Sequence, residues 1–286
     1  MMQLLFNGLV SGMLVALPAL ALALTFSVLR FANFSIGAML TVGAYLIYWC
    51  NTAWGLNLLW AAVVGTGLAA LLAAAIDFVV YRPLRDRSTI TLLVASMGVS
   101  FVLENAVSFL AGNTPVGYAV DVARPLRWAG LRVNHEQLLG AGVSLASLVV
   151  IGLVFGYTRL GRAMRAVADN PSLAATRGVS RQRVATLTWL LSGALAAIAG
   201  MLIGLDTTLD PQMGWNYVLP VFAAAILGGL THPLAAIPGA LVMGVFAELS
   251  TLVLPPHYRT LVAFVVLSLL LVVRPSGLLG RKWVHK

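Results

Sequence analysis

The chain has 286 residues, of which 60% are hydrophobic and only 9% are charged. Soluble domains carry about 25% charged residues, so this composition excludes an ordinary soluble protein and indicates a membrane protein with several spans. The net charge of +9 does not indicate a nucleic-acid partner. The basic residues lie in short loops beside apolar runs, which is the orientation signal of membrane proteins. The single cysteine, Cys50, excludes an internal disulfide.

Apolar runs long enough to cross a bilayer recur along the whole chain, since about 20 apolar residues suffice for one transmembrane helix. They lie at about residues 3–29, 34–50, 57–81, 88–112, 136–157, 184–206, 216–230, 235–254 and 259–274. The runs 34–50, 216–230 and 259–274 are short enough to be tilted, broken or re-entrant. The first run lacks the features of a cleaved signal peptide and is expected to be retained. Because backbone polar groups in lipid must be satisfied internally and strand-type alternation is absent, we predict an all-α membrane bundle of eight or nine segments.

The basic residues predict the sidedness of these segments. One side holds fourteen of them: Arg30, Arg82, Arg85, Arg87, Arg159, Arg162, Arg165, Arg177, Arg181, Arg183, Arg274, Arg281, Lys282 and Lys286. The other side holds four: Arg124, Arg127, Arg132 and Arg259. Since basic loops stay in the cytoplasm, we predict the N-terminus outside and the C-terminus in the cytoplasm. The loop 113–135 is then external, where it either meets an external partner or serves only as a connector.

The segment 158–183 is a polar, arginine-rich insert between two apolar runs. It contains six arginines and one acidic residue, Asp169. Asn170 is suited to cap a helix, Pro171 to occupy its first position, and Gly178 to close it about two turns later. The pattern therefore predicts a short, capped helix in a cytoplasmic loop, a place where a partner can make contact.

Small residues spaced by four predict close helix packing within the bundle. The pairs are Gly8 with Gly12, Gly193 with Ala197, and Ala240 with Gly244. Such residues let helix backbones approach closely in lipid. We interpret them as intramolecular packing positions, with a subunit interface as the alternative.

Motifs of soluble enzymes are absent from the sequence. It has no GxxxxGK[ST] phosphate-binding loop, no HExxH and no CxxC, and its four histidines are scattered. Asp206 and Asp210 are unconvincing as a metal pair, because no His or third carboxylate is near them in the sequence. Asp77, one turn before Tyr81, is predicted to pair with an arginine. If the protein uses ATP, another chain must bind it.

Four sequence blocks, in order, carry a resemblance to a known family. They are LRFANF at 29–34 followed by Gly37 and GAY at 43–45, YRPLR at 81–85, LGRAMRA at 160–166 running on to Gly178, and AILGG at 225–229 followed by IPGA at 237–240. With these blocks the chain resembles a permease subunit of the branched-chain amino acid ABC importer family, the LivH-like half of the LivH/LivM pair.

The resemblance implies a set of partners and a place in the cell. It implies pairing with a second homologous permease, identical or different, with two cytoplasmic ATPases and with an external solute-binding protein. It implies no cofactor on this chain, since ATP and Mg²⁺ belong to the ATPases, and no nucleic acid. The expected location is the inner (cytoplasmic) membrane of a bacterium, in which the chain passes the lipid bilayer several times. Residues 1–286 would then form a single transmembrane permease domain.

In such importers a short cytoplasmic helix docks in a cleft of the ATPase, and the resemblance assigns that role to 158–183. The family pattern Glu-Ala-Ala-x-x-x-Gly corresponds here to SLAATRG at 172–178, in which Ser172 and Leu173 replace the Glu and the first Ala. The predicted coupling residues are Arg162, Arg165, Asn170, Pro171, Leu173, Ala174, Ala175 and Gly178. Leu173 offers an apolar anchor, and the arginines can pair with acidic groups. The alternative is that the arginines only enforce topology against lipid headgroups.

Polar residues within apolar runs suggest a substrate pathway. The predicted set is Asn33, Ser35, Gly37, Glu104 and Asn105. Polar side chains at membrane depth face the bundle interior or a cavity, but they also serve as helix–helix hydrogen-bonding groups. The family block continues with a His and a Glu where this chain has Ile36 and Ala38, so a titratable pair is missing.

The sequence at 227–233 contains a helix stop, because Gly and Pro both oppose continuation. We predict a tight inner-surface turn formed by Gly228, Gly229, His232 and Pro233, with a discontinuous helix as the alternative.

The expected function follows from the resemblance. It is import of amino acids, branched-chain or related small polar solutes such as urea, amides or carboxylates, with ATP hydrolysed by partner subunits. One alternative is a secondary transporter driven by an ion gradient, with Glu104 or Glu248 as proton carrier. Another is a passive channel.

Overall fold

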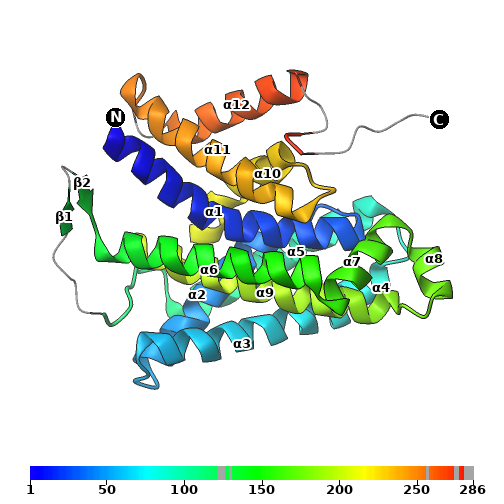
Figure 1. The fold of residues 1–286 in the computed structure, drawn as a ribbon. Helices are drawn as coiled ribbons and strands as arrows, with labels where there is room; N and C mark the ends of the chain where they lie inside the picture. Colours follow the sequence, from blue (N-terminus) through cyan, green and yellow to red (C-terminus); the bar gives the residue numbers. More distant parts are fainter. Residues whose placement is uncertain (121–125, 129–130, 256–257, 274–276, 280–286) are drawn as a thin grey trace.

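The computed structural model describes residues 1–120, 126–128, 131–255, 258–273 and 277–279, and these form a helical bundle (Figure 1). The sidedness residues Arg124, Arg274, Arg281, Lys282 and Lys286 lie outside the described residues. The main helices are α1 Met2–Leu29, α2 Ile36–Thr52, α3 Leu58–Ile76, α5 Thr89–Ala111, α6 His135–Tyr157, α9 Arg181–Asp206, α10 Met213–Gly228, α11 Ala236–Leu249 and α12 Arg259–Val273. The shorter helices are π-helix η1 Asp77–Tyr81, α4 Arg82–Leu84, α7 Arg159–Asp169, α8 Pro171–Thr176, η2 Pro233–Ala235 and η3 Ser250–Leu252.

Each predicted apolar run contains a helix in the structure. Within the described ranges, six helical segments are long and apolar enough to cross a membrane: Met2–Leu29, Leu58–Leu84, Thr89–Ala111, His135–Tyr157, Arg181–Asp206 and Pro233–Leu252. Met213–Gly228 is a shorter apolar helix. The helical fold and its multi-pass character are therefore confirmed, while the count of eight or nine segments and the sides of the two termini stay predictions.

Helices α1 and α9 occupy the centre of the bundle (Figure 1). In each, 72% of the most apolar window is buried, against 22% in α5 and 28% in α6. Helix α1 packs on α6, α9, α10 and α11, so most of its apolar surface is covered by protein, except near its N-terminus, where Leu5 and Leu9 are exposed. The outer helices instead expose large apolar side chains, as a membrane helix does toward lipid or a second subunit.

Close backbone contacts at small residues hold the central helices together. A Cβ on Gly8 would lie 2.8 Å from Cα of Val245 in α11, and one on Gly193 would lie 2.5 Å from Cβ of Ala73 in α3. A Cβ on Gly200 in α9 would lie only 2.1 Å from the backbone oxygen of Leu40 in α2. The predicted packing role of Gly8 and Gly193 is confirmed.

The loop 113–135 contains a short hairpin that the sequence did not reveal. Strands β1 Leu126–Trp128 and β2 Leu131–Val133 pair antiparallel. Each strand has three residues, which is too few to show the alternation of apolar and polar residues that predicts a strand. The start of the loop is tied to the bundle: Val116 bridges to Leu209, and Oη of Tyr118 donates to the Ala44 oxygen at 3.0 Å. Burial raises the pKa of the Tyr118 phenol, so the group remains a hydrogen-bond donor.

Candidate functional site

The segment 158–183 folds into α7 and α8, which project together from one end of the bundle (Figure 1). Helix α7 begins where the Thr158 hydroxyl accepts a hydrogen bond from the Gly161 N–H at 3.2 Å. A Cβ on Gly161 would lie 2.2 Å from the backbone oxygen of Phe155. Only glycine therefore lets α7 fold back closely against the end of α6.

Helix α7 has one apolar face, which packs on α1, α6 and α9. Met164 and Val167 on this face are at most 2% exposed. Side-chain packing therefore attaches α7 to the membrane bundle. This helix was not predicted, because its arginines conceal the apolar spacing in the sequence.

Helix α8 has the caps that the sequence predicted. The Asn170 Oδ1 accepts from the Leu173 N–H at 3.0 Å and from the Ser172 hydroxyl at 2.7 Å, and Pro171 is the first helical residue. Gly178 follows with φ 79°, a left-handed conformation that favours glycine. The predicted capped helix is confirmed; its role in contacting an ATPase stays a prediction.

The surface of α8 combines an exposed apolar side chain with a cleft. Leu173 is 59% exposed, whereas Ala174 is buried against the bundle. Beside them lies a cleft of about 270 Å³. It is lined by Ala166, Asp169, Asn170, Leu173, Ala174, Arg177 and Val179. Ala175 is exposed on the same short helix. The projecting leucine and the adjacent hollow form a shape that a partner surface can match.

Two of the predicted coupling arginines make contacts inside the chain. Arg162 Nη1 donates to the Tyr157 oxygen at 3.1 Å, and Arg165 donates to the oxygens of Phe155 and Gly156. These carbonyls end α6, where backbone acceptors have no helical partner and the helix dipole is negative. Arg165 also lies over the Phe155 ring, 5.2 Å from its centroid. Both arginines therefore stabilise the α6–α7 corner, whatever else they contact.

A third arginine reaches this segment from the other end of the chain. Arg30 Nη2 donates to the backbone oxygen of Ala168, in the last turn of α7. Arg30 follows α1 directly, with φ 62°, and is the one non-glycine residue with positive φ in the described part of the chain. From the sequence, Arg30 is a topology signal and part of the LRFANF block, and no contact is predicted for it.

Two of the predicted pathway residues lie together in a buried polar cluster. Asn33 and Ser35 are fully buried, and Asn33 Oδ1 accepts from the Ser35 hydroxyl at 2.7 Å. The Ser35 oxygen lies 3.0 Å from Oη of Tyr81 in η1, and the Tyr81 ring stacks on Trp189 of α9 with centroids 4.6 Å apart. These contacts join the residues just before α2 to η1 and α9, so the polar side chains tie elements of the bundle together. Tyr81 and Trp189 could not be linked to Asn33 by their sequence spacing.

The other predicted pathway residues lie elsewhere. Gly37 meets α10, because a Cβ there would be 2.6 Å from the Gly214 oxygen. Glu104 and Asn105 lie further along α5; Asn105 is exposed and its amide donates to Phe101 of its own helix at 2.7 Å. Glu248 is buried in α11 beside α1. The structure thus does not gather the predicted set around one cavity, and the pathway assignment stays a prediction.

An ion pair lies next to the polar cluster. Asp77 is 1% exposed, and Arg85 Nη2 lies 2.5 Å from its Oδ1. The predicted pairing of Asp77 with an arginine is confirmed. The pair spans the π-helical turn η1, so it fixes the end of α3 to α4.

The predicted inner-surface turn is a tight turn between two packed helices. Helix α10 ends at Gly228, and Gly229 has φ 118°. A Cβ on Gly228 would lie 2.0 Å from the Ala235 oxygen. His232 is exposed, and Pro233 starts η2. The chain thus turns here between two packed helices, while the place of this turn at the inner surface stays a prediction.

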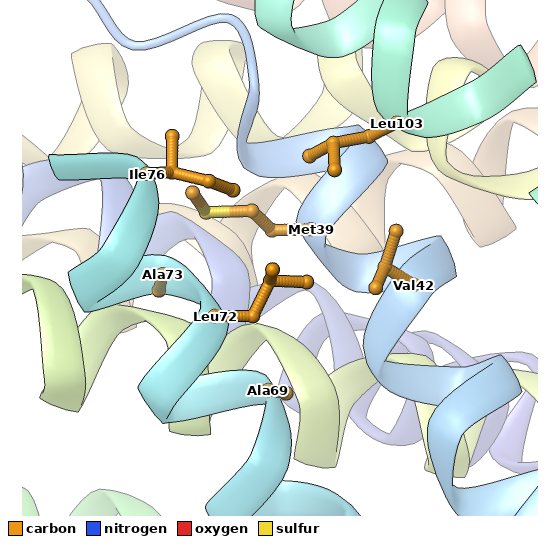
Figure 2. A pocket seen from close by; sticks show the side chains of 7 residues that line it. All are labelled: Met39, Val42, Ala69, Leu72, Ala73, Ile76 and Leu103. Atoms are coloured by element: carbon orange, nitrogen blue, oxygen red, sulfur yellow. The ribbon is translucent and has the colours of Figure 1, made fainter. Parts of the chain in front are cut away.

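A small cavity lies among α2, α3 and α5 (Figure 2). Its volume is about 10 Å³, room for about one water molecule. It is lined by Met39, Val42, Ala69, Leu72, Ala73, Ile76 and Leu103. A solute needs more room and polar groups, so this cavity is not a solute site. The described residues also contain no cluster of three His, Cys, Asp or Glu that could hold a metal.

Comparison with known proteins identifies the family. Residues 4–271 match the model of the family described as "Branched-chain amino acid transport system / permease component". The chain belongs to this family. The match covers nearly the whole helical bundle, from α1 to α12, so the resemblance inferred from the four sequence blocks is confirmed.

Curated relatives agree with this placement, and a solved structure has a similar fold. The chain is 30% identical over 305 residues to the high-affinity branched-chain amino acid transport system permease protein LivH of Escherichia coli (strain K12), a match that covers 100% of this chain and 97% of the relative. It is 29% identical over 306 residues to BraD of Pseudomonas aeruginosa, with the same coverage. A chain of PsaBC from Streptococcus pneumoniae, in complex with Fab, has TM-score 0.51 and 14% identity over 94% of this chain and 91% of that one. This last likeness concerns the fold alone.

Proposed function

We propose that this family member is a permease subunit of an ABC importer that carries branched-chain amino acids into the cytoplasm of a bacterium. The observation that carries the proposal is the end-to-end similarity to LivH, which covers 100% of this chain and 97% of the relative. The named relatives are permeases of branched-chain amino acid transport systems. They give no support to the alternative of ion-gradient-driven transport through Glu104 or Glu248.

Energy enters this proposed importer through partner subunits. This chain binds no ATP or Mg²⁺; two cytoplasmic ATPases bind both. Helix α8 contacts an ATPase through exposed Leu173 and the adjacent cleft. An apolar side chain inserted into a partner surface and surrounded by charged residues such as Arg177 fits the usual arrangement of an interface, an apolar centre with a polar rim.

Movement of the ATPase reaches the membrane through α7. This helix is attached to α6 by Arg162 and Arg165, and to α1 and α9 by packing of Met164 and Val167. Because packed helices move as rigid units, displacement of α8 tilts α7 and the helices that it touches. Alternating access follows if those helices have two arrangements.

The solute route lies between this chain and a second permease subunit, as the family resemblance implies, and the small apolar cavity among α2, α3 and α5 is not part of it. An external binding protein delivers the solute at the side where the loop 113–135 lies. Asn105, exposed on α5, offers an amide to a solute on this route. The buried residues Asn33 and Ser35 hold together the helices that lie behind this solute route.

The test is reconstitution of the chain with its partner permease, the two ATPases and the binding protein in proteoliposomes. We expect uptake of labelled leucine that needs ATP and the binding protein, and that is inhibited by isoleucine and valine but not by urea, acetamide or succinate. Gly178→Arg, which forces a side chain into a left-handed conformation, is expected to uncouple ATP hydrolysis from uptake. ATP-independent uptake that a protonophore abolishes would refute the proposal.

A further inference from the structure

We infer that the α1–α2 linker, residues 30–35, transmits movement of α7 and α8 to α10, and that Arg30 is the positioning residue at its entry. The inference rests on the proposed function, since it concerns how energy from an ATPase reaches the membrane helices. The linker contacts four elements that are far apart in sequence: α7, η1, α5 and α10.

The linker begins at Arg30, whose side chain donates a hydrogen bond to the backbone oxygen of Ala168. The acceptor lies two residues before Asn170, the cap of α8, so a shift of α8 acts directly on this contact. The guanidinium also lies at the negative end of the α7 dipole, and a charge-assisted hydrogen bond there is stronger than a neutral one. A left-handed arginine is unfavourable by itself and persists only where its surroundings fix it. The side-chain bond therefore fixes the position of the linker backbone.

The exit of the linker is Phe34. Its ring stacks on Phe222 of α10, with centroids 4.6 Å apart and planes 26° apart. Its N–H donates to the Ser96 hydroxyl of α5 at 3.1 Å. Phe222 lies two residues after Pro220, where the missing N–H of proline weakens α10 and lets it bend. Phe34 therefore contacts α10 within one turn of the proline at which the helix can bend.

The middle of the linker rests on the buried polar cluster with Tyr81. Phe31 packs on the Tyr81 ring with centroids 5.4 Å apart, and Asn33 Oδ1 accepts from both Ser35 and Tyr81. Within the described residues the Nδ2 group of Asn33 is buried without a hydrogen-bond partner. An unsatisfied buried donor is costly, so any arrangement of the cluster that gives Asn33 Nδ2 a partner is favoured. The π-helical turn that carries Tyr81 is a common feature of functional sites.

The test uses the complete reconstituted transporter and measures solute imported per ATP hydrolysed, together with basal ATPase activity and copurification of the ATPases. Arg30→Gly keeps the left-handed backbone and removes the guanidinium; Arg30→Lys restores a charged donor. Phe34→Ala removes the contact with α10. Arg87→Ala, which removes an exposed charge outside the linker and the coupling segment, is the matched control.

We expect Arg30→Gly to lower the import per ATP about tenfold, the effect of one charge-assisted hydrogen bond. We expect Phe34→Ala, which removes the ring stack with Phe222, to lower it by a similar factor. Copurification and basal activity should stay normal in both variants. Arg30→Lys should recover part of the loss, and Arg87→Ala should match the wild type. A wild-type ratio in Arg30→Gly, or a loss that only follows the release of the ATPases, overturns the inference. If Arg30→Gly does not assemble, Phe34→Ala decides by the same criterion. A wild-type complex without ATP-driven uptake refutes the proposed function instead.

Discussion

Replacing Asn170 by alanine is expected to weaken ATPase binding about fivefold, with an upper bound near thirtyfold. The Asn170 side chain accepts two hydrogen bonds at the start of α8. Loss of such a cap costs about 1 kcal/mol and at most about 2 kcal/mol, and each 1.4 kcal/mol corresponds to a factor of ten in affinity. Helix α8 is six residues long, far too short to be stable alone, and of these residues it buries only Ala174. The cap therefore determines the fraction of permease molecules in which α8 is folded and can bind the ATPase.

The assay is binding of the purified ATPase to the permease held in lipid nanodiscs, measured by biolayer interferometry. Asn170→Ser is the matched control, since serine caps a helix about as well as asparagine and is also neutral. It should bind the ATPase as the wild type does. Loss of the cap alone should change the affinity more than about twofold. If Asn170→Ala binds the ATPase within about twofold of the wild type, α8 is not the contact or does not depend on its cap. An equal loss in both variants would refute the capping argument.

Two further predictions concern stability and are checked by thermal unfolding in detergent. Asp77→Asn leaves the Arg85 charge uncompensated in a buried site and should cost about 3–5 kcal/mol; an unchanged melting temperature would contradict a structural role for the pair. Gly200→Ala places a Cβ 2.1 Å from the Leu40 oxygen and should cost about 1–3 kcal/mol. The control Gly67→Ala has no atom within 4 Å of the new Cβ and should be neutral or slightly stabilising; equal losses in both would refute the packing argument.

Features encoded locally could be predicted from the sequence. The positions of the apolar runs predicted the main helices, because length and hydrophobicity alone determine which segments are helical in lipid. Asn170, Pro171 and Gly178 gave α8, since capping depends on residues a few positions apart. The tight turn at Gly228 and Gly229 follows from the same kind of local rule.

Features that depend on distant residues could not be predicted. Arg162 and Arg165 were interpreted by charge, but their acceptors are backbone oxygens whose exposure depends on how α7 folds back on α6. The contact of Arg30 with Ala168 joins residues 138 positions apart. Side chains at one membrane depth also have no common sequence signal, so Asn33 could not be assigned to Tyr81 rather than to Glu104.

The two short helices of the coupling segment differ in how firmly they are held, and this difference suits an energy-transmitting element. Helix α7 is fixed by buried Met164 and Val167 and by arginines bound to backbone oxygens. Helix α8 is held by its caps and by one buried alanine. A loosely held helix can adapt to a partner surface that changes shape during ATP hydrolysis, because little packing is lost when it shifts. A firmly held helix passes that shift on, because packed interfaces move as units rather than deform. If instead α8 were firmly held and α7 loosely held, α7 would shift relative to the bundle. The movement of α8 would then not reach α1.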